Sequence, residues 1–255
     1  MSVADPPLGR LRLHEIAAAC LHIVFPMPCR TCHHPLDLQH VSDLCGRCWT
    51  ALERMPANGC AHCGWPFPDP AGTAGAEAPL CQRCRETRDH FRVARAVLRY
   101  RDGGIARAAI LLAKHGGRFT LMRQLAQLLA EATPQYLSLQ DWDGLVPVPL
   151  HWLRRWRRGF NQAVVLARAV GKRHRLPVLA GALGRVRSTP EQHGNLEARR
   201  RNVRDAFAVR AVVTGRRLLL VDDVFTTGAT ADACAAALLR AGAAEIGVLT
   251  LARVE

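Results

Sequence analysis

Two adjacent carboxylates, Asp222 and Asp223, follow a short apolar run and precede a loop of small polar residues. The run at residues 218–221 is typical of a parallel strand that is buried on both faces. The stretch at residues 225–230 is rich in Thr and Gly and leads into an apolar helix. Loop amides, hydroxyls and the start of a helix can cradle a phosphate group. The two carboxylates would then hold hydroxyl groups or a magnesium ion of the same ligand.

Eight of the ten cysteines form four CxxC pairs. They are Cys29/Cys32, Cys45/Cys48, Cys60/Cys63 and Cys81/Cys84. Each pair aims two thiolates at one point and two pairs complete a tetrahedral zinc site, so the sequence predicts two Zn2+ ions in a double ribbon. Sequential pairing gives the shortest loops, and interleaved pairing stays open. We expect His33, His34 and His62 to be bystanders, and Cys20 and Cys234 to be small core residues.

A second anion-binding turn is predicted after an apolar strand at residues 145–149. Four cations follow this strand: Arg154, Arg155, Arg157 and Arg158. A helix begins near Asn161, so this strand, basic loop and helix repeat the pattern of a phosphate site. The basic Gly-rich turn at residues 114–118 either meets an anion or is a solvated helix end. The polar stretch at residues 185–204 is typical of a functional or disordered loop.

The order of elements from residue 93 onward supplies the scaffold for these groups. Strands are predicted at residues 93–100 (with one solvent-facing side), 145–149, 176–183, 218–221 and 245–252. Helices are predicted at residues 103–113, 121–132, 161–175 and 231–241. This alternation predicts a parallel sheet with helices on both faces and a site at the carboxyl ends of the strands. We divide the chain into an N-terminal segment with a helix at residues 8–25 (1–28), the double zinc ribbon (29–90) and the α/β domain (91–255).

Composition indicates the cellular compartment and the class of partner. The net charge of +14 comes mostly from Arg. It favours a phosphorylated ligand, nucleic acid or an acidic protein, or it reflects only solvated basic faces. The sequence shows neither a usual secretory signal nor a run of 18 apolar residues. We therefore expect a cytoplasmic protein whose cysteines bind metal rather than form disulfides.

The segment LLLVDDVFTTGAT at residues 218–230 resembles the motif by which type I phosphoribosyltransferases bind 5-phosphoribosyl 1-pyrophosphate (PRPP). Three further segments narrow the resemblance to the ComF family: VPVP at 146–149, RRGFNQA at 157–163 and the polar stretch at 187–207. An N-terminal double zinc ribbon fits the same family. The resemblance runs in order from about residue 11 to residue 253, and it implies a type I phosphoribosyltransferase fold behind the ribbon.

The resemblance implies a role for each matching residue. Asp222 and Asp223 would bind the ribose hydroxyls of PRPP, with Mg2+ on the same ligand. The 5-phosphate would be held by Thr226, Thr227, Gly228, Ala229 and Thr230. Arg158 would face the pyrophosphate, with Arg157 as the weaker candidate, so the catalytic set would be Asp222, Asp223 and Arg158. Residues 188–201 would close over the reacting centre.

Two functions from different classes fit these residues. In the first, the protein is a phosphoribosyltransferase in which an acceptor displaces pyrophosphate from C1 of the ribose. In the second, it is a non-catalytic PRPP sensor that binds single-stranded DNA or a helicase-like protein of DNA uptake. The resemblance links the family to natural competence at the inner side of the cytoplasmic membrane, where a chain without a transmembrane segment would associate peripherally. The acceptor pocket, which would distinguish the two, falls to residues 91–140, where no base-reading motif is present.

Overall fold

The computed structural model describes residues 28–36, 43–67, 79–87, 89–115, 118–150, 160–186 and 206–255. The chain forms two compact units, Met1–Ala51 and Leu52–Glu255. The boundary between them falls between the second and the third cysteine pair. The second four-cysteine group is therefore part of the larger unit. The helix predicted at residues 8–25, together with Cys20, lies outside the described residues.

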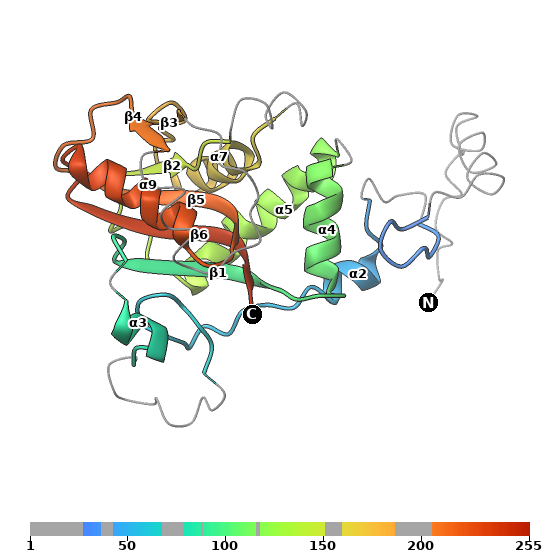
Figure 1. Cartoon of the computed structure of the whole chain (residues 1–255). Coiled ribbons are helices and arrows are strands. Elements are labelled where there is room, and N and C mark those ends of the chain that lie inside the picture. Colours follow the sequence, from blue (N-terminus) through green and yellow to red (C-terminus); the bar gives the residue numbers. More distant parts are fainter. Residues whose placement is uncertain are drawn as a thin grey trace, which may run out of the picture. The chain divides into compact units, whose positions relative to one another are not determined.

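Helices and strands are interspersed along the larger unit (Figure 1). In chain order its elements are α3 (Gln82–Glu86), β1 (Val93–Tyr100), α4 (Ile105–His115), α5 (Phe119–Ala132), η2 (Thr133–Gln135), β2 (Gly144–Pro147), α7 (Gln162–His174), β3 (Leu183–Arg185), β4 (Phe207–Val209), β5 (Arg217–Phe225), α9 (Ala229–Arg240) and β6 (Glu245–Val254). The smaller unit contains α2 (Gly46–Thr50). No helix among the described residues combines the length and the apolar character needed to cross a bilayer.

The main sheet has four strands in the order β1-β6-β5-β2, and all neighbouring strands are parallel. Residues of β5 alternate between its two faces. Leu218 and Leu220 pack in one core with Cys234 and Leu238 of α9. On the other side α7 contacts β5 and β2, while α5 contacts β6. The predicted parallel sheet flanked by helices is thus confirmed, and buried Cys234 is a core residue as expected.

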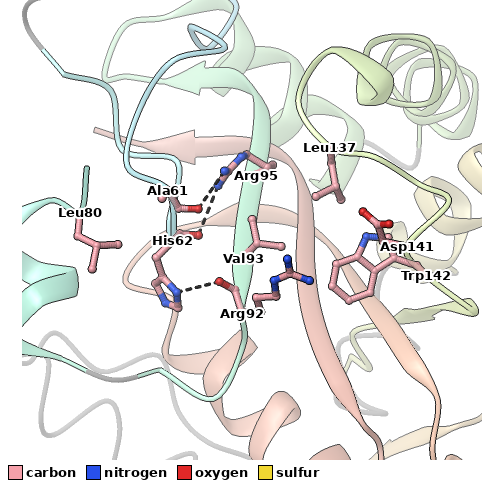
Figure 2. A pocket seen from close by; sticks show the side chains of 9 residues that line it. All are labelled: Ala61, His62, Leu80, Arg92, Val93, Arg95, Leu137, Asp141 and Trp142. Carbon is pink, nitrogen blue, oxygen red and sulfur yellow. Dashed lines mark hydrogen bonds between the residues drawn. The ribbon is translucent and has the colours of Figure 1, made fainter. Parts of the chain in front are cut away.

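The solvent-facing side predicted for β1 is partly covered: Val93, Arg95 and Arg99 on that side are half-buried, and Val97 is buried. The segment that carries Met55 and the start of the second cysteine group lies along the edge of β1, with backbone bonds from Met55 N to Val97 O (2.8 Å) and from Ala94 N to His62 O (2.7 Å). The guanidinium of Arg95 donates to the carbonyls of Ala61 (2.9 Å) and His62 (3.4 Å). Figure 2 shows the two hydrogen bonds of Arg95 beside a pocket of about 450 Å³. A polar residue in a strand thus binds a covering segment instead of water.

The strand predicted at residues 176–183 was wrong over most of its length. Val178 forms a single parallel bridge with Leu145, and Pro177 has no N–H with which to extend the pairing. Strand β3 begins only at Leu183, and it pairs antiparallel with β4. A second, two-stranded sheet therefore stands beside the main one.

Candidate functional site

The two carboxylates lie on β5 itself, because the strand continues beyond the predicted apolar run to Phe225. Asp222 pairs in register with Thr250 of β6. Both carboxylates are partly buried, and the Asp222 side chain accepts a hydrogen bond from the backbone N–H of Asp223 at 2.9 Å. The acids therefore stand near the carboxyl end of a central strand, as the sequence predicted.

Burial and a like charge make ionisation of Asp222 unfavourable. Burial is the larger cause and the neighbouring Asp223 charge is the second, and together they raise the pKa of Asp222 to about 7. The backbone N–H of Asp223 and the cations Lys114 and Arg185 oppose the rise in pKa. A carboxyl with such a pKa is typical of a site that is completed by a ligand or a metal ion.

Lys114 pairs with the second carboxylate. Its Nζ lies 2.8 Å from Oδ2 of Asp223, and the two side chains are only 16% and 14% exposed. Lys114 stands near the end of α4, in the basic turn at residues 114–118. For this turn the sequence left two alternatives, an anion partner or a solvated helix end. The partner is an anion of the protein itself. The sequence offered the cation but no indication of which acid it meets.

The loop after β5 has the geometry of an anion cradle. Gly228 is buried and adopts a φ of +81°, and a Cβ at this position would lie 2.7 Å from Cζ of Phe225. The first helical bond of α9 is donated by Asp232 N to Gly228 O at 2.8 Å. The amides of Thr230 and Ala231 precede this bond, so they have no partner inside the helix. A positive φ, free amides and the positive end of a 12-residue helix meet here.

The second predicted anion turn is described only in part. α7 begins at Gln162 as expected, with Asn161 as its N-cap. Asn161 Oδ1 accepts from the amide of Ala163 at 3.0 Å, and its Nδ2 donates to the carbonyl of Val148 at 3.1 Å. The side chain of Asn161 thus caps the helix. Arg154, Arg155, Arg157 and Arg158 lie outside the described residues, as does the predicted closing loop at 188–201.

The eight paired cysteines form two groups, and the pairing follows the order of the chain. The groups are Cys29, Cys32, Cys45 and Cys48, and Cys60, Cys63, Cys81 and Cys84. In each group all four sulfur atoms lie within 4.8 Å of one another. The shortest separations are 3.5–3.7 Å, and a tetrahedron of ~2.3 Å zinc–sulfur bonds has edges of about 3.8 Å. Both groups therefore fit zinc. None of the described histidines belongs to either group.

The two groups share one local design. The third cysteine is the N-cap of a five-residue helix, α2 or α3, and its amide donates to the sulfur of the first cysteine at 3.3 Å. The turn after the second cysteine needs a positive φ, which Gly64 and His33 supply at +68° and +59°. Gly46, which follows the third cysteine of the first group, begins α2. Burial works to raise the pKa of Cys60, but the amides of Cys63 and Cys81 outweigh it and lower this pKa to about 6.

A basic groove of about 1170 Å³ runs between α5, α7 and the region of β3. Six cations line it: Arg123, Arg168, Lys172, Arg173, Arg185 and Arg210. Glu131 is the single acid among the described lining residues. Phe119 and Phe160 also line the groove, packed edge to face with ring centroids 5.4 Å apart. Only the net charge was evident from the sequence, because these residues come from distant segments.

The chain is similar in sequence to several known proteins. Residues 20–85 match the model of the double zinc ribbon domain. The chain is 32% identical to DNA utilization protein YhgH of Salmonella typhimurium over 239 residues, which cover 91% of this chain and 99% of that one. It is 30% identical to Competence protein F of Haemophilus influenzae, with coverage of 87% and 96%.

The larger unit also aligns in part with solved structures. The glutamine PRPP amidotransferase of B. subtilis, complexed with ADP and GMP, aligns with 51% of this chain and 25% of its own, at 23% identity and a TM-score of 0.35. The full-length relatives are the stronger finding, since both proteins named above reach 30% identity or more over nearly their whole length. With a double zinc ribbon ahead of a parallel sheet, and with such relatives, the chain belongs to the ComF family.

Proposed function

We propose that the protein binds PRPP together with Mg2+ at the carboxyl end of β5, and that it acts in the use of incoming DNA during competence. The observation that carries the proposal is the acid pair at the end of a buried strand, followed at once by a left-handed glycine at the start of α9. Asp222 and Asp223 would accept hydrogen bonds from the two ribose hydroxyls. The loop at residues 226–230 would bind the 5-phosphate.

The chemistry of the two carboxylates suits magnesium that arrives with its ligand. Mg2+ prefers oxygen ligands, and in nucleotide sites it is held by one or two carboxylates together with substrate phosphates. Asp222 and Asp223 supply such a partial set. When bound, the ion would offset negative charge on the pyrophosphate. The raised pKa of Asp222 supports this proposal. Without a ligand the ionised carboxylate is unfavourable, and a cation bound at the acid pair would favour the ionised form.

The names of the relatives support the biological half of the proposal. One is called a DNA utilization protein and another Competence protein F. Both align with this chain from near one end to the other.

Titration calorimetry with Mg2+ and PRPP tests the site. The double variant Asp222→Asn with Asp223→Asn should lose at least roughly a hundredfold in affinity, since each carboxylate loses a charge-assisted hydrogen bond. Asp102→Asn is the matched control, because Asp102 is 99% exposed and pairs with Arg107. Unchanged affinity in the double variant would overturn the proposed site.

A pyrophosphate-release assay separates a transferase from a sensor. In transfer, the acceptor's nitrogen or oxygen bonds to C1, and the bond from C1 to pyrophosphate breaks. Pyrophosphate leaves with the electron pair, and the acceptor's proton passes to solvent. Release that depends on one added base or amine would establish transfer. Tight PRPP binding with no release across bases and amines would establish the sensor.

Binding of single-stranded DNA is the second candidate function, and the basic groove favours it. Proteins that bind single strands combine a positively charged groove with aromatic side chains. The six cations and the pair Phe119 and Phe160 supply both features. Phe119 is 47% exposed, so part of its ring is open to stacking.

Fluorescence anisotropy with a labelled oligothymidylate tests the groove. Arg168→Ala combined with Lys172→Ala should weaken binding, and it should reduce the slope of log K against log salt by roughly 0.7 for each phosphate that the variant no longer neutralises. Arg240→Ala is the control, because this exposed arginine ends α9 on the other face of the sheet. An equal loss of affinity in both variants would indicate only diffuse charge attraction. If the protein binds an acidic protein but no oligothymidylate, the acidic protein replaces DNA as the proposed partner of the groove.

A further inference from the structure

The second ribbon, which carries Cys60, Cys63, Cys81 and Cys84, contacts the proposed phosphate loop through Arg83. This arginine lies between two zinc-binding cysteines, Cys81 and Cys84, on α3. Its Nη2 donates to the carbonyl of Thr227 at 2.6 Å, and the same atom lies 3.7 Å from Asp89. In a planar trans peptide the C=O and the following N–H point in opposite directions. By holding the Thr227 carbonyl, Arg83 therefore turns the N–H of Gly228 away from the ribbon.

Arg253 makes a second connection, to the residue that precedes the loop. This residue of β6 is only 3% exposed. Its Nη1 donates to the carbonyl of Cys63 at 2.7 Å, and its Nη2 lies 3.7 Å from the Cys63 sulfur. The guanidinium also lies over two rings, 5.1 Å from the Trp65 centroid and 4.7 Å from that of Phe225. Phe225 is the last residue of β5, so this cation joins a zinc ligand to the residue from which the loop departs.

The segment that follows α3 makes a third connection, to the first turn of α9. The backbone N–H of His90 donates to Asp232 Oδ1 at 2.6 Å, and the ring Nδ1 of His90 lies 2.9 Å from the same atom. Phe91 stacks on His62 at 4.9 Å and meets Phe225 edge to face at 6.1 Å. Three independent connections thus converge on the loop and on the helix that follows it.

The shape of this ribbon depends on its metal. α3 has five residues, and isolated helices shorter than ~12 residues are marginal in water. Small domains of this kind take their folding free energy from the bound zinc. Loss of the ion would therefore free Arg83 and the Cys63 partner of Arg253 together.

We propose that the cluster of Cys60, Cys63, Cys81 and Cys84 positions the phosphate loop through Arg83 and Arg253. Zinc at this cluster is then required for anion binding at residues 226–230. The part of the proposal that concerns PRPP rests on the proposed function, whereas the order of the loop does not. Arg83 and Arg253 act here as positioning residues.

Hydrogen exchange of the peptide that spans residues 225–232, without ligand, is the first test. In Arg83→Ala, with zinc content and melting temperature unchanged, exchange of this peptide should accelerate roughly tenfold, the effect of losing one hydrogen bond from a charged donor. Arg83→Lys should restore part of the protection. Arg85→Ala is the matched control, since Arg85 lies exposed on the same helix. Equal exchange in Arg83→Ala and Arg85→Ala would overturn the coupling.

Metal loss at each cluster separately is the second test. Cys81→Ser should lose one zinc and bind Mg2+ and PRPP at least roughly tenfold more weakly. Cys32→Ser should lose one zinc and keep its affinity, because Arg83 lies within the second cluster and Arg253 binds Cys63 of that same cluster. Equal losses of affinity in the two variants would refute a specific role. If the wild type binds no PRPP, the proposed function fails, and the exchange experiment still decides the coupling.

Discussion

Asp222→Asn should stabilise the fold while it removes the ligand site. In the folded protein burial and the Asp223 charge raise the pKa of Asp222 from 3.8 to about 7. The folded state therefore holds a proton that the unfolded chain has released between these pH values. Stability falls as pH rises from about 4 to about 7, and the whole penalty is present above pH 7. Asparagine carries no charge at any of these pH values, so the penalty disappears.

The size of the effect follows from the shift in pKa. About three pKa units at about 1.4 kcal/mol each set an upper bound of about 4 kcal/mol. The carboxyl is only partly buried, so we expect about half of that value at pH 8. The hydrogen bond from the Asp223 amide to Asp222 Oδ1 survives, because asparagine keeps a carbonyl oxygen at that position.

Urea unfolding of Asp222→Asn and wild type, followed by circular dichroism, measures this difference at each pH. The variant should gain about 2 kcal/mol at pH 8 and clearly less at pH 5. Comparison within one pH removes any shared effect of acid on the zinc clusters. A variant that is less stable than wild type at pH 8, or equally stabilised at both values, would refute the electrostatic account of this site.

Metal analysis should find about two zinc ions per chain, whereas a metal-free, disulfide-bonded protein would contradict the ribbon geometry. Gly228→Ala should cost at least about 1 kcal/mol in urea unfolding, because alanine is strained at a positive φ and its Cβ would meet Phe225. The same variant should lose PRPP affinity in calorimetry, and wild-type affinity would show that the loop tolerates another shape. Lys114→Met should cost about 1–3 kcal/mol at pH 8, since Asp223 loses the cation beside its partly buried carboxylate; an unchanged urea midpoint would show that water replaces Lys114.

The parts of the site that adjoin in sequence were predictable. The acids, the glycine and the start of α9 fall within one stretch at residues 218–230, so strand, loop and helix could be inferred from spacing. The cysteine groups were predictable for the same reason, because each CxxC pair forms its own turn. A glycine can indicate a positive φ in a sequence, as at Gly64, whereas a histidine such as His33 does not indicate it.

The pairings between distant segments could not be predicted. Lys114 and Asp223 are far apart in the chain, and a basic turn has many acids to choose from. Arg253 and Cys63 are 190 residues apart, and Arg83 and Thr227 are 144 apart. The strands β3 and β4 have three residues each, which is too short for a periodic pattern. These two strands pair only after the fold has brought them together.

The charge of the second zinc cluster stabilises two arginines beside it, Arg95 and Arg253. Burial lowers the pKa of Arg253 and of Arg95, and nearby thiolates oppose that change: Cys63 acts on both arginines and Cys60 on Arg95. Zinc with four thiolates carries a net charge of about −2, whereas four neutral thiols carry none. Release of the metal followed by protonation therefore removes the charge that compensates buried Arg253 and partly buried Arg95. Arg253 contacts both Cys63 and Phe225, so this electrostatic loss acts at the residue from which the proposed phosphate loop departs.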